Sequence, residues 1–162
     1  MSAPFEFSSE NRARFERILE RYPRKRAAML PTLHLAQEQL GYISPEVEEY
    51  VAGLLEVPIV DVREVLSFYT LFFQKPMGRR HIRVCASLSC WIRGGDEVTA
   101  HLRELLGIEE GEVSEDGSVS WEVVPDCLGA CEIAPMMQVD GRFEGNLTRE
   151  RIDGILRNNQ KR

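Results

Sequence analysis

Four cysteines are the residues of this 162-residue chain best suited to chemistry, and none of them precedes residue 85. They form two pairs, Cys85-x4-Cys90 and Cys127-x3-Cys131, which are separated by a long intervening segment. Clustered cysteines in a chain without a secretory signal more often hold a metal or take part in redox chemistry than form structural disulfides. The sequence therefore contains one candidate site.

Four converging thiolates could hold a structural zinc ion, which takes a tetrahedral set of four ligands. They could instead hold a [2Fe–2S] cluster, in which each iron takes two cysteines and two bridging sulfides. Two pairs from two loops suit the wider binuclear cluster better than a single ion, and zinc stays open. Dithiol–disulfide exchange of the thioredoxin type needs C-x-x-C at a helix N-terminus, which the sequence lacks. Cysteines without a ligand or joined in disulfides are the remaining alternative.

The composition narrows the class of protein. Hydrophobic residues make up 43% of the chain, so a core can be buried in one ordinary domain or two small ones. The net charge of −6 and the pI near 5.2 argue against a nucleic-acid binder. No apolar run approaches the roughly 20 residues that span a bilayer, so we expect no direct membrane insertion. Residues 1–6 have neither the basic nor the apolar region of a secretory signal.

The second half has the periodicity of an α/β domain. Two alternating segments, His81–Cys85 and Val119–Val123, predict strands, and Asp96–Leu106 between them predicts a helix that Gly107 closes. The strands of a βαβ unit end at the same edge of a sheet, so we expect both cysteine pairs to meet there, with Cys90 just before the helix. A further strand, a hairpin turn and a last helix follow, at Met136–Val139, Asp140-Gly141 and a cap at Thr148. The order β-α-β, then β-β-α, is typical of a thioredoxin-type sandwich.

The first half predicts a small antiparallel bundle of short helices. The expected helices begin at a Ser9 cap and end at Pro23, cover Lys25–Leu40 with Pro31 inside, begin at Ser44-Pro45-Glu46, and cover Ile59–Tyr69. Pro31 means that the second helix either starts later or is kinked. Pro76 and Gly78 break the pattern, so we expect residues 1–76 to form the bundle and 77–162 the second domain.

Residues near the cysteines could support a cluster. Gly94, Gly95 and Gly129 would let the backbone approach sulfide atoms, and Arg83 and Arg93 could offset negative charge. Ordinary turns and surface charges explain the same residues equally well. Four cysteines already complete a ligand set, so we assign no ligand role to the histidines at His34, His81 and His101.

The cysteine pattern resembles a known family. The chain is closely similar to the thioredoxin-like [2Fe–2S] subunit of NADH–quinone oxidoreductase, respiratory complex I, in its compact bacterial form. Four segments carry the resemblance along nearly the whole chain: Tyr22-Pro23, Gly41-Tyr42-Ile43, Ser67–Phe72, and the cysteine pairs with Cys127-Leu128-Gly129-Ala130-Cys131 and Ala134-Pro135. The resemblance implies an α+β fold, with an N-terminal helical bundle followed by a thioredoxin-like ferredoxin domain. Asp140 stands where many relatives have Asn.

The resemblance also implies a ligand set and a role. Cys85 and Cys90 would bind one iron of a [2Fe–2S] cluster, and Cys127 and Cys131 the other. The chain would exchange single electrons with the flavin of an adjacent NADH-binding subunit, which would hold both FMN and NADH. No G-x-G-x-x-G or Walker A motif marks a nucleotide site here, so we expect no catalytic residue on this chain and no NADH turnover by it alone. The complex would place it in the cytoplasm, on the inner face of the cell membrane.

Three further expectations accompany this interpretation. The same resemblance fits the diaphorase subunit of an NAD-linked hydrogenase or formate dehydrogenase, and a zinc-stapled interaction module is the alternative from another class. The helical half and the loops around the cluster are the candidate docking surface. The aromatic residues Phe68, Tyr69, Phe72 and Phe73 could line that contact but more simply pack between the two halves. Analogy with thioredoxin-like folds predicts a cis bond before Pro135.

Overall fold

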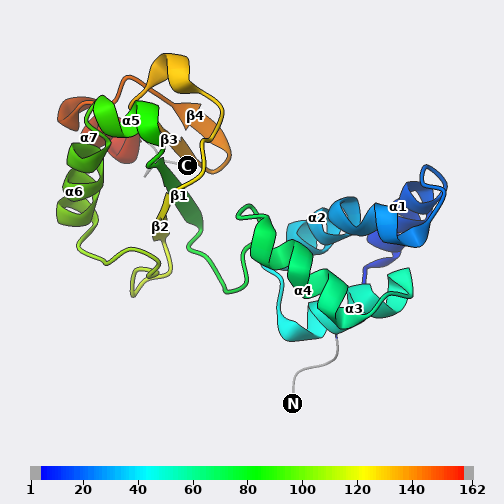
Figure 1. The fold of residues 1–162 in the computed structure, drawn as a ribbon. Coiled ribbons are helices and arrows are strands. Elements are labelled where there is room, and N and C mark those ends of the chain that lie inside the picture. Colours follow the sequence, from blue (N-terminus) through cyan, green and yellow to red (C-terminus); the bar gives the residue numbers. More distant parts are fainter. Residues whose placement is uncertain (1–4, 159–162) are drawn as a thin grey trace. The chain divides into compact units, whose positions relative to one another are not determined.

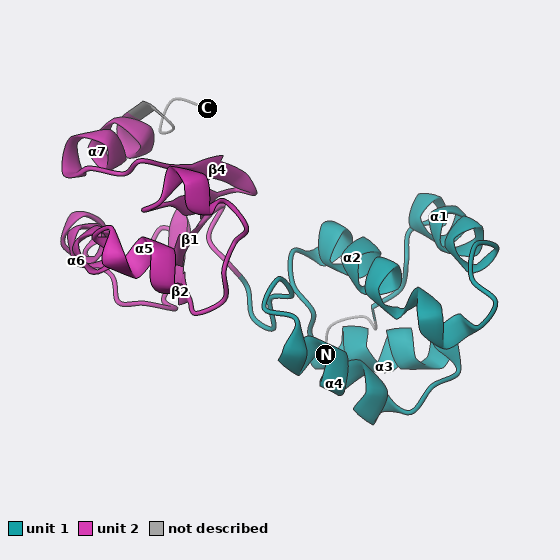
Figure 2. Ribbon diagram, turned by 45° about the horizontal axis from the view of Figure 1, so that its top comes forward, with its two compact units in different colours: residues 1–76 teal, residues 77–162 magenta. Residues whose placement is uncertain are grey.

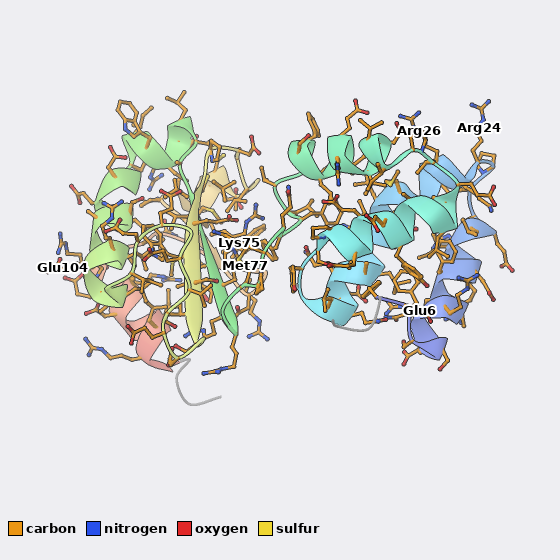
Figure 3. The ribbon with its side chains drawn as sticks, turned by 90° about the horizontal axis from the view of Figure 1, so that it is seen from below. Glu6, Arg24, Arg26, Lys75, Met77 and Glu104 are labelled. Atoms are coloured by element: carbon orange, nitrogen blue, oxygen red, sulfur yellow. The ribbon has the colours of Figure 1, made fainter. Side chains whose placement is uncertain are left out.

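The computed structural model describes residues 5–158 of the chain, and the chain divides into two compact units. Unit 1 is Met1–Pro76 and unit 2 is Met77–Arg162, coloured teal and magenta in Figure 2. Lys75 and Met77, labelled in Figure 3, lie on the segment that joins them. Each unit buries its own hydrophobic residues, so each has a separate core.

Unit 1 is entirely helical among its described residues. Its elements are α1 (Ser9–Leu19), a 3₁₀ turn (Lys25–Ala28), α2 (Met29–Leu40), α3 (Pro45–Leu55) and α4 (Ile59–Phe68), as Figure 1 shows. Apolar side chains at helical spacing form the core between them, including Phe15, Leu33, Val47, Val51, Leu55, Val62 and Leu66. The expected small helical bundle is confirmed.

The start of α1 differs by one residue from the prediction. Ser8, not Ser9, caps the helix, and its hydroxyl accepts a hydrogen bond from the amide of Asn11 at 3.2 Å. Either serine could serve by sequence. A long-range contact decides between them, because the Ser8 amide donates to the side chain of Gln39 at 3.0 Å and holds the entering backbone extended.

The next two helix starts follow ordinary rules for proline. The helix α2 begins only at Met29, so Pro31 lies in its first turn, where the amide has no partner within the helix. The later start is thus correct. Ser44 caps α3 through the Val47 amide at 3.4 Å, and Pro45 is the first helical residue, as predicted.

Unit 2 is built on a four-stranded sheet with the order β2-β1-β3-β4. The strands are β1 (Arg80–Cys85), β2 (Val119–Val124), β3 (Met137–Val139) and β4 (Arg142–Glu144). The central strand β1 is parallel to β2 and antiparallel to β3, and β4 is antiparallel to β3. The helices are α5 (Leu88–Ile92), α6 (Gly95–Leu106) and α7 (Arg149–Asn158), with a 3₁₀ turn at Cys131–Ile133. This order confirms the predicted α+β, thioredoxin-like arrangement.

The core of unit 2 fixes the sheet against two helices. Ile82 of β1 and Trp121 of β2 are fully buried together with Leu102 of α6 and Ile152 of α7. The indole nitrogen of Trp121 donates to the carbonyl of Ile108 at 3.0 Å, so this buried polar group is satisfied. The sheet therefore offers a rigid support for what lies at its edges.

The hairpin and the last helix begin as predicted. Asp140 and Gly141 both have positive φ, 49° and 81°, which the two-residue turn between β3 and β4 requires. Aspartate tolerates this conformation much as asparagine does, and its carboxylate accepts from the His81 amide at 2.8 Å. The hydroxyl of Thr148 accepts from the Arg151 amide and caps α7.

The aromatic residues after α4 do not act as one group. Phe72 is buried in the core of unit 1, where its ring lies 5.0 Å from that of His34. Phe68 is 76% exposed, and Tyr69 packs edge-on against it. Phe72 is thus a core residue of one unit. Among residues 5–158, no helix is long and apolar enough to cross a membrane.

Candidate functional site

The end of the parallel strand pair positions the cysteines. Cys85 is the last residue of β1 and pairs in register with Val124, the last residue of β2. Cys127 follows β2 in a loop, and Cys131 opens the 3₁₀ turn at Cys131–Ile133. Both pairs therefore lie beyond the same sheet edge, as the βαβ argument predicts.

The placement of Cys90 differs from the prediction. It lies inside the short helix α5 rather than just before α6. Gly94, with φ of 95°, separates the two helices, and Gly95 starts α6 against the carbonyl of Cys90. A side chain at Gly95 would come within 3.0 Å of that carbonyl, so glycine is needed for the close approach.

One pair, Cys85 and Cys90, is buried. These side chains are 2% and 1% exposed, and they pack with Ala130, Ala134 and Met136 in a small cluster separate from the main core. Burial raises the pKa of Cys90 to about 11, because a thiolate is poorly solvated there. We call Cys85 and Cys90 the inner pair.

The other pair, Cys127 and Cys131, is exposed, and its two sulfur atoms lie 3.2 Å apart. The amide of Gly129 donates to the sulfur of Cys127 at 3.4 Å. This hydrogen bond, followed by that from Cys131, lowers the pKa of Cys127, whereas the Cys127 side chain raises the pKa of Cys131. Gly129 thus fulfils the expectation that a backbone amide can reach sulfur. We call Cys127 and Cys131 the outer pair.

The inner and outer pairs interact with each other. The thiol of Cys90 is influenced by Cys85 and by the charge of Cys131, and Cys127 is hydrogen-bonded with Cys85. All four are free thiols rather than disulfides. The fold therefore collects into one place four sulfur atoms that the sequence holds far apart.

Two serines near this site were not expected. The hydroxyl of Ser87 hydrogen-bonds with Cys127, and that of Ser89 hydrogen-bonds with Cys131. Both come from the turn and helix that carry Cys90, so α5 supplies polar groups to the outer pair. Their only sequence signal is their position beside Cys90 in the segment Ser87-Leu88-Ser89-Cys90.

The donor set fits a binuclear iron–sulfur cluster better than a single metal ion. Within residues 5–158, no three or more His, Cys, Asp or Glu side chains form a group that could hold one metal ion. Tetrahedral zinc needs four ligands around one point. In a [2Fe–2S] cluster each iron needs only two thiolates, because bridging sulfides supply the rest. Two interacting pairs of thiols match that requirement.

Arg83 does not have the role expected of it. Its guanidinium donates to Glu122 at 2.8 Å across the β1–β2 pair, so it neutralises a sheet carboxylate rather than charge at the cysteines. Burial raises the pKa of Glu122, but hydrogen bonds from His81 and Arg83 outweigh it and keep that pKa below its ordinary value. Arg93 is exposed at the end of α5, beside the site.

The histidines have partners away from the cysteines. The ring of His34 packs on Phe72, and Nδ1 of His81 lies 2.8 Å from the hydroxyl of Ser120. Nε2 of His101 lies 2.8 Å from a carboxylate oxygen of Asp153, which ties α6 to α7. These contacts give each histidine a structural role.

Pro135 follows a cis peptide bond from Ala134, which confirms the prediction. Its neighbours Ala134 and Met136 belong to the cluster around the inner cysteines. The Pro135 carbonyl accepts a hydrogen bond from the Leu147 amide at 3.1 Å. The proline segment is thus part of the wall of the site.

The outer face of α5 is apolar and exposed. Leu88, Trp91 and Ile92 are 68%, 57% and 68% exposed, although Cys90 on the same helix is buried. The Trp91 indole nitrogen donates to Asp96 at 2.9 Å, which fixes the ring. We call Leu88, Trp91 and Ile92 the α5 patch. Contiguous exposed apolar groups of this kind mark interaction sites.

Relatives of known name share most of this chain, and both of those described here are subunits of an NADH-quinone oxidoreductase. The relative from Rhizobium meliloti (strain 1021) is 42% identical over 145 residues, 90% of this chain and 86% of the relative. The relative from Rickettsia bellii (strain RML369-C) is 41% identical over 155 residues, 94% of this chain and 92% of the relative. Both alignments include the helical half as well as the sheet.

A solved structure shares the fold. An NAD⁺-reducing [NiFe]-hydrogenase in the H₂-reduced state matches with a TM-score of 0.68 at 24% identity, over 83% of this chain and 22% of that chain. The family model for the thioredoxin-like [2Fe-2S] ferredoxin matches residues 15–160. With its paired cysteines at the end of a β-α-β unit, this chain belongs to the thioredoxin-like [2Fe–2S] ferredoxin family.

Proposed function

We propose that this chain is the electron-transfer subunit of an NADH–quinone oxidoreductase. It would carry one [2Fe–2S] cluster, with Cys85 and Cys90 on one iron and Cys127 and Cys131 on the other. The observation that carries the proposal is the meeting of two thiol pairs at one sheet edge, in a chain of this family. Relatives named as components of that oxidoreductase favour this assignment over a hydrogenase.

The residues around the cysteines suit a negatively charged group. A bound [2Fe–2S] cluster accepts and returns one electron at a time. The Gly129 amide and the hydroxyls of Ser87 and Ser89 already hydrogen-bond to sulfur in the outer pair. Such bonds stabilise thiolate charge and tune the reduction potential. Burial keeps water from the inner pair, so the two irons would have unequal surroundings.

The proposed partner is the flavin- and NADH-binding subunit of the same complex. Electron transfer requires close approach, so the partner must cover a surface near the cysteines. The α5 patch supports this, because the five-residue helix that carries it also carries Cys90. Unit 1 contains none of the four cysteines, and we propose that residues 1–76 add docking surface. FMN and NADH would stay on the partner.

The proposed location follows from the complex. As part of the peripheral arm of the oxidoreductase, the chain would lie in the cytoplasm, on the inner face of the cell membrane. The membrane attachment would come from other subunits.

Metal analysis of the purified chain tests the cluster. Protein isolated without oxygen should be reddish-brown, contain iron and sulfide in equal amounts, and give an electron paramagnetic resonance signal when reduced. Colourless protein that contains zinc and no iron would instead favour the zinc-stapled interaction module.

Activity measurements test the division of labour. The iron-loaded chain alone should not oxidise NADH, and adding the flavin-binding partner should produce NADH-dependent reduction of the cluster signal. Turnover by the chain without a flavoprotein would contradict the proposal. A neighbouring nickel–iron hydrogenase gene would favour the diaphorase alternative, since a gene for a flavin-binding partner fits both.

A further inference from the structure

The outer pair differs from the inner pair in ways that matter when no cluster is bound. Cys127 and Cys131 are exposed and their sulfur atoms lie 3.2 Å apart. We propose that in the cluster-free chain this pair is a modification site. It reacts with a small disulfide such as oxidised glutathione and closes into an intramolecular disulfide, while the inner pair stays reduced.

Access selects the outer pair. Thiol–disulfide exchange needs the attacking sulfur to approach the target disulfide directly. Cys85 and Cys90 are 2% and 1% exposed beneath Ala130, Ala134 and Met136, so a glutathione molecule cannot reach them. The outer sulfurs lie on the solvent side of the same site. Burial therefore divides four chemically identical thiols into a protected pair and a reactive pair.

The loop between the outer cysteines allows the bond to close. A disulfide places its sulfurs about 2.05 Å apart, so the two atoms must approach each other by roughly 1 Å. Gly129, with φ of 84°, makes the turn between them, and no atom lies within 4 Å of where its side chain would be. The loop has space to move, and the Gly129 amide already holds the Cys127 sulfur within it.

The exchange balances in two steps. The Cys127 thiolate attacks oxidised glutathione, forms a mixed disulfide and releases one glutathione thiolate, which takes up the proton of Cys127. The Cys131 sulfur then attacks the Cys127 sulfur of that mixed disulfide, releases the second glutathione and leaves the protein disulfide. Two protein thiols are oxidised, and one glutathione disulfide is reduced to two thiols.

The consequence for loading rests on the proposed function. If Cys127 and Cys131 hold one iron, their disulfide removes both protein ligands of that iron and leaves only the buried half of the site. The oxidised chain would then take up no [2Fe–2S] cluster until a dithiol reduces it. Oxidation would act as a reversible block on assembly rather than on the finished protein.

The experiment uses the full-length, iron-free, fully reduced chain. It is incubated with oxidised glutathione, and intact mass and peptide mapping then locate the disulfide. We expect a mass loss of one pair of hydrogens, a Cys127–Cys131 bond and two remaining free thiols. A Cys85–Cys90 or Cys85–Cys127 bond, a stable glutathione adduct on the wild-type chain, or no reaction would overturn the proposal.

Matched variants separate the two steps. The variants Cys131→Ser and Cys127→Ser should each stop at a single glutathione adduct on the remaining outer cysteine, because the resolving thiol is absent. Absence of that adduct would contradict the accessibility argument.

Iron loading is measured afterwards on the same samples. The reduced wild-type chain should load, the oxidised chain should lose loading, and a dithiol should restore it. Equal loading of oxidised and reduced chains would overturn the proposed block. If neither form loads iron while the mass result holds, the proposed function fails and the modification site stands.

Discussion

At the scale of single residues, the exposure of each cysteine determines the effect of replacing it. The inner and outer pairs have the same proposed task, but only the inner pair also fills the protein interior. The sulfur of Cys85 lies 3.8 Å from the carbonyl of Asp126, which exceeds the reach of a hydroxyl hydrogen bond. Stability and iron content should therefore respond differently to the same substitution at the two pairs.

We predict that Cys85→Ser and Cys127→Ser both lose the cluster, but only Cys85→Ser destabilises the iron-free chain. A buried hydroxyl without a good partner costs about 1–3 kcal/mol, whereas Cys127 is exposed and its replacement should cost little. Iron analysis and visible absorption measure the first effect, and urea unfolding of the iron-free chain measures the second. Full iron content in Cys127→Ser would contradict its ligand role.

A second prediction concerns pH and the turn before β2. The hydroxyl of Ser114 and the amide of Ser118 donate to Asp116 at 2.6 and 2.9 Å, and these bonds lower the pKa of Asp116 to about 2. A lowered folded-state pKa means that the stabilisation is present above the unfolded value of about 3.9 and is lost as pH falls toward 2. NMR titration of the Asp116 carboxyl should therefore give a midpoint near 2.

The control lies at the adjacent position. Asp116→Asn should reduce the acid sensitivity of the unfolding midpoint between about pH 4 and 2, whereas Glu115→Gln changes the same charge and should leave it as in the wild type. An Asp116 titration near 3.9 would show that the turn does not hold the carboxylate.

At the scale of elements, short contacts at helix ends and loop junctions decide how the site is held. The segments that carry the cysteines are a five-residue helix, a loop and a 3₁₀ turn, none of which has much stability of its own. Their geometry depends on neighbours such as Gly95 and Gly145, where a side chain would collide with other parts of the fold.

Gly145→Ala tests the junction after β4. A methyl group there would overlap the side chain of Ile133, which ends the 3₁₀ turn that begins at Cys131. We expect a loss of about 1–3 kcal/mol in unfolding free energy and weaker iron retention. Gly154→Ala is the matched control, because it lies in α7 with no atom within 4 Å of the added carbon and should stabilise the helix by up to about 1 kcal/mol. Equal unfolding midpoints for the two variants would refute the steric argument.

The first helix offers a test of capping with neighbouring serines. Ser8→Ala should lower the unfolding free energy by about 1 kcal/mol, because it removes the acceptor for the Asn11 amide. Ser9→Ala should have almost no effect, since Ser9 is the first residue inside the helix and alanine suits that position. Urea unfolding followed by circular dichroism distinguishes the two, and a larger loss for Ser9→Ala would contradict the assigned cap.

At the scale of the whole molecule, two units with separate cores divide the sequence into a part with the cysteines and a part without them. The surface of unit 1 carries many charges, with Arg24 and Arg26 at its outer edge in Figure 3. Arg26 pairs with Asp61 and Lys25 with Glu56, so this basic run stabilises contacts between helices of unit 1. The α5 patch is the exposed apolar surface nearest to the proposed ligands.

We predict that Trp91→Ala weakens binding to the flavin-binding partner and leaves the cluster spectrum unchanged. Aromatic anchors at interfaces contribute about 2 kcal/mol or more, which is roughly a thirtyfold change in dissociation constant. Phe143→Ala is the control, because Phe143 is similarly exposed (51% against 57%) but lies on β4. Titration of the iron-loaded chain with the flavin-binding partner measures both. Equal affinities for the two variants would show that the partner does not cover the α5 patch.

Much of the fold could be predicted from local pattern. The helices of unit 1, the β-α-β and β-β-α order, the Ser44 cap and the Asp140-Gly141 turn are confirmed, because each depends on residues close together in sequence. The edge shared by Cys85 and the loop after β2 was also predictable, since parallel strands in a β-α-β unit end together.

Features that depend on long-range partners were not predictable. Arg83 pairs with Glu122 because β1 and β2 are in register, and Ser8 caps α1 because Gln39 reaches its amide. The short helix α5 around Cys90 was missed, because five residues are too few to show a period.

The sequence by itself determined the chemistry of the site: four thiols in two pairs, placed after two parallel strands, in a recognisable family pattern. Only the tertiary structure decided which pair is buried and which is exposed, which serines reach the outer sulfurs, and that the helix beside Cys90 presents an apolar face. Residue type and spacing fix what a side chain can bind. Solvent access and hydrogen-bond partners instead depend on contacts between distant segments, and these exist only once the chain has folded.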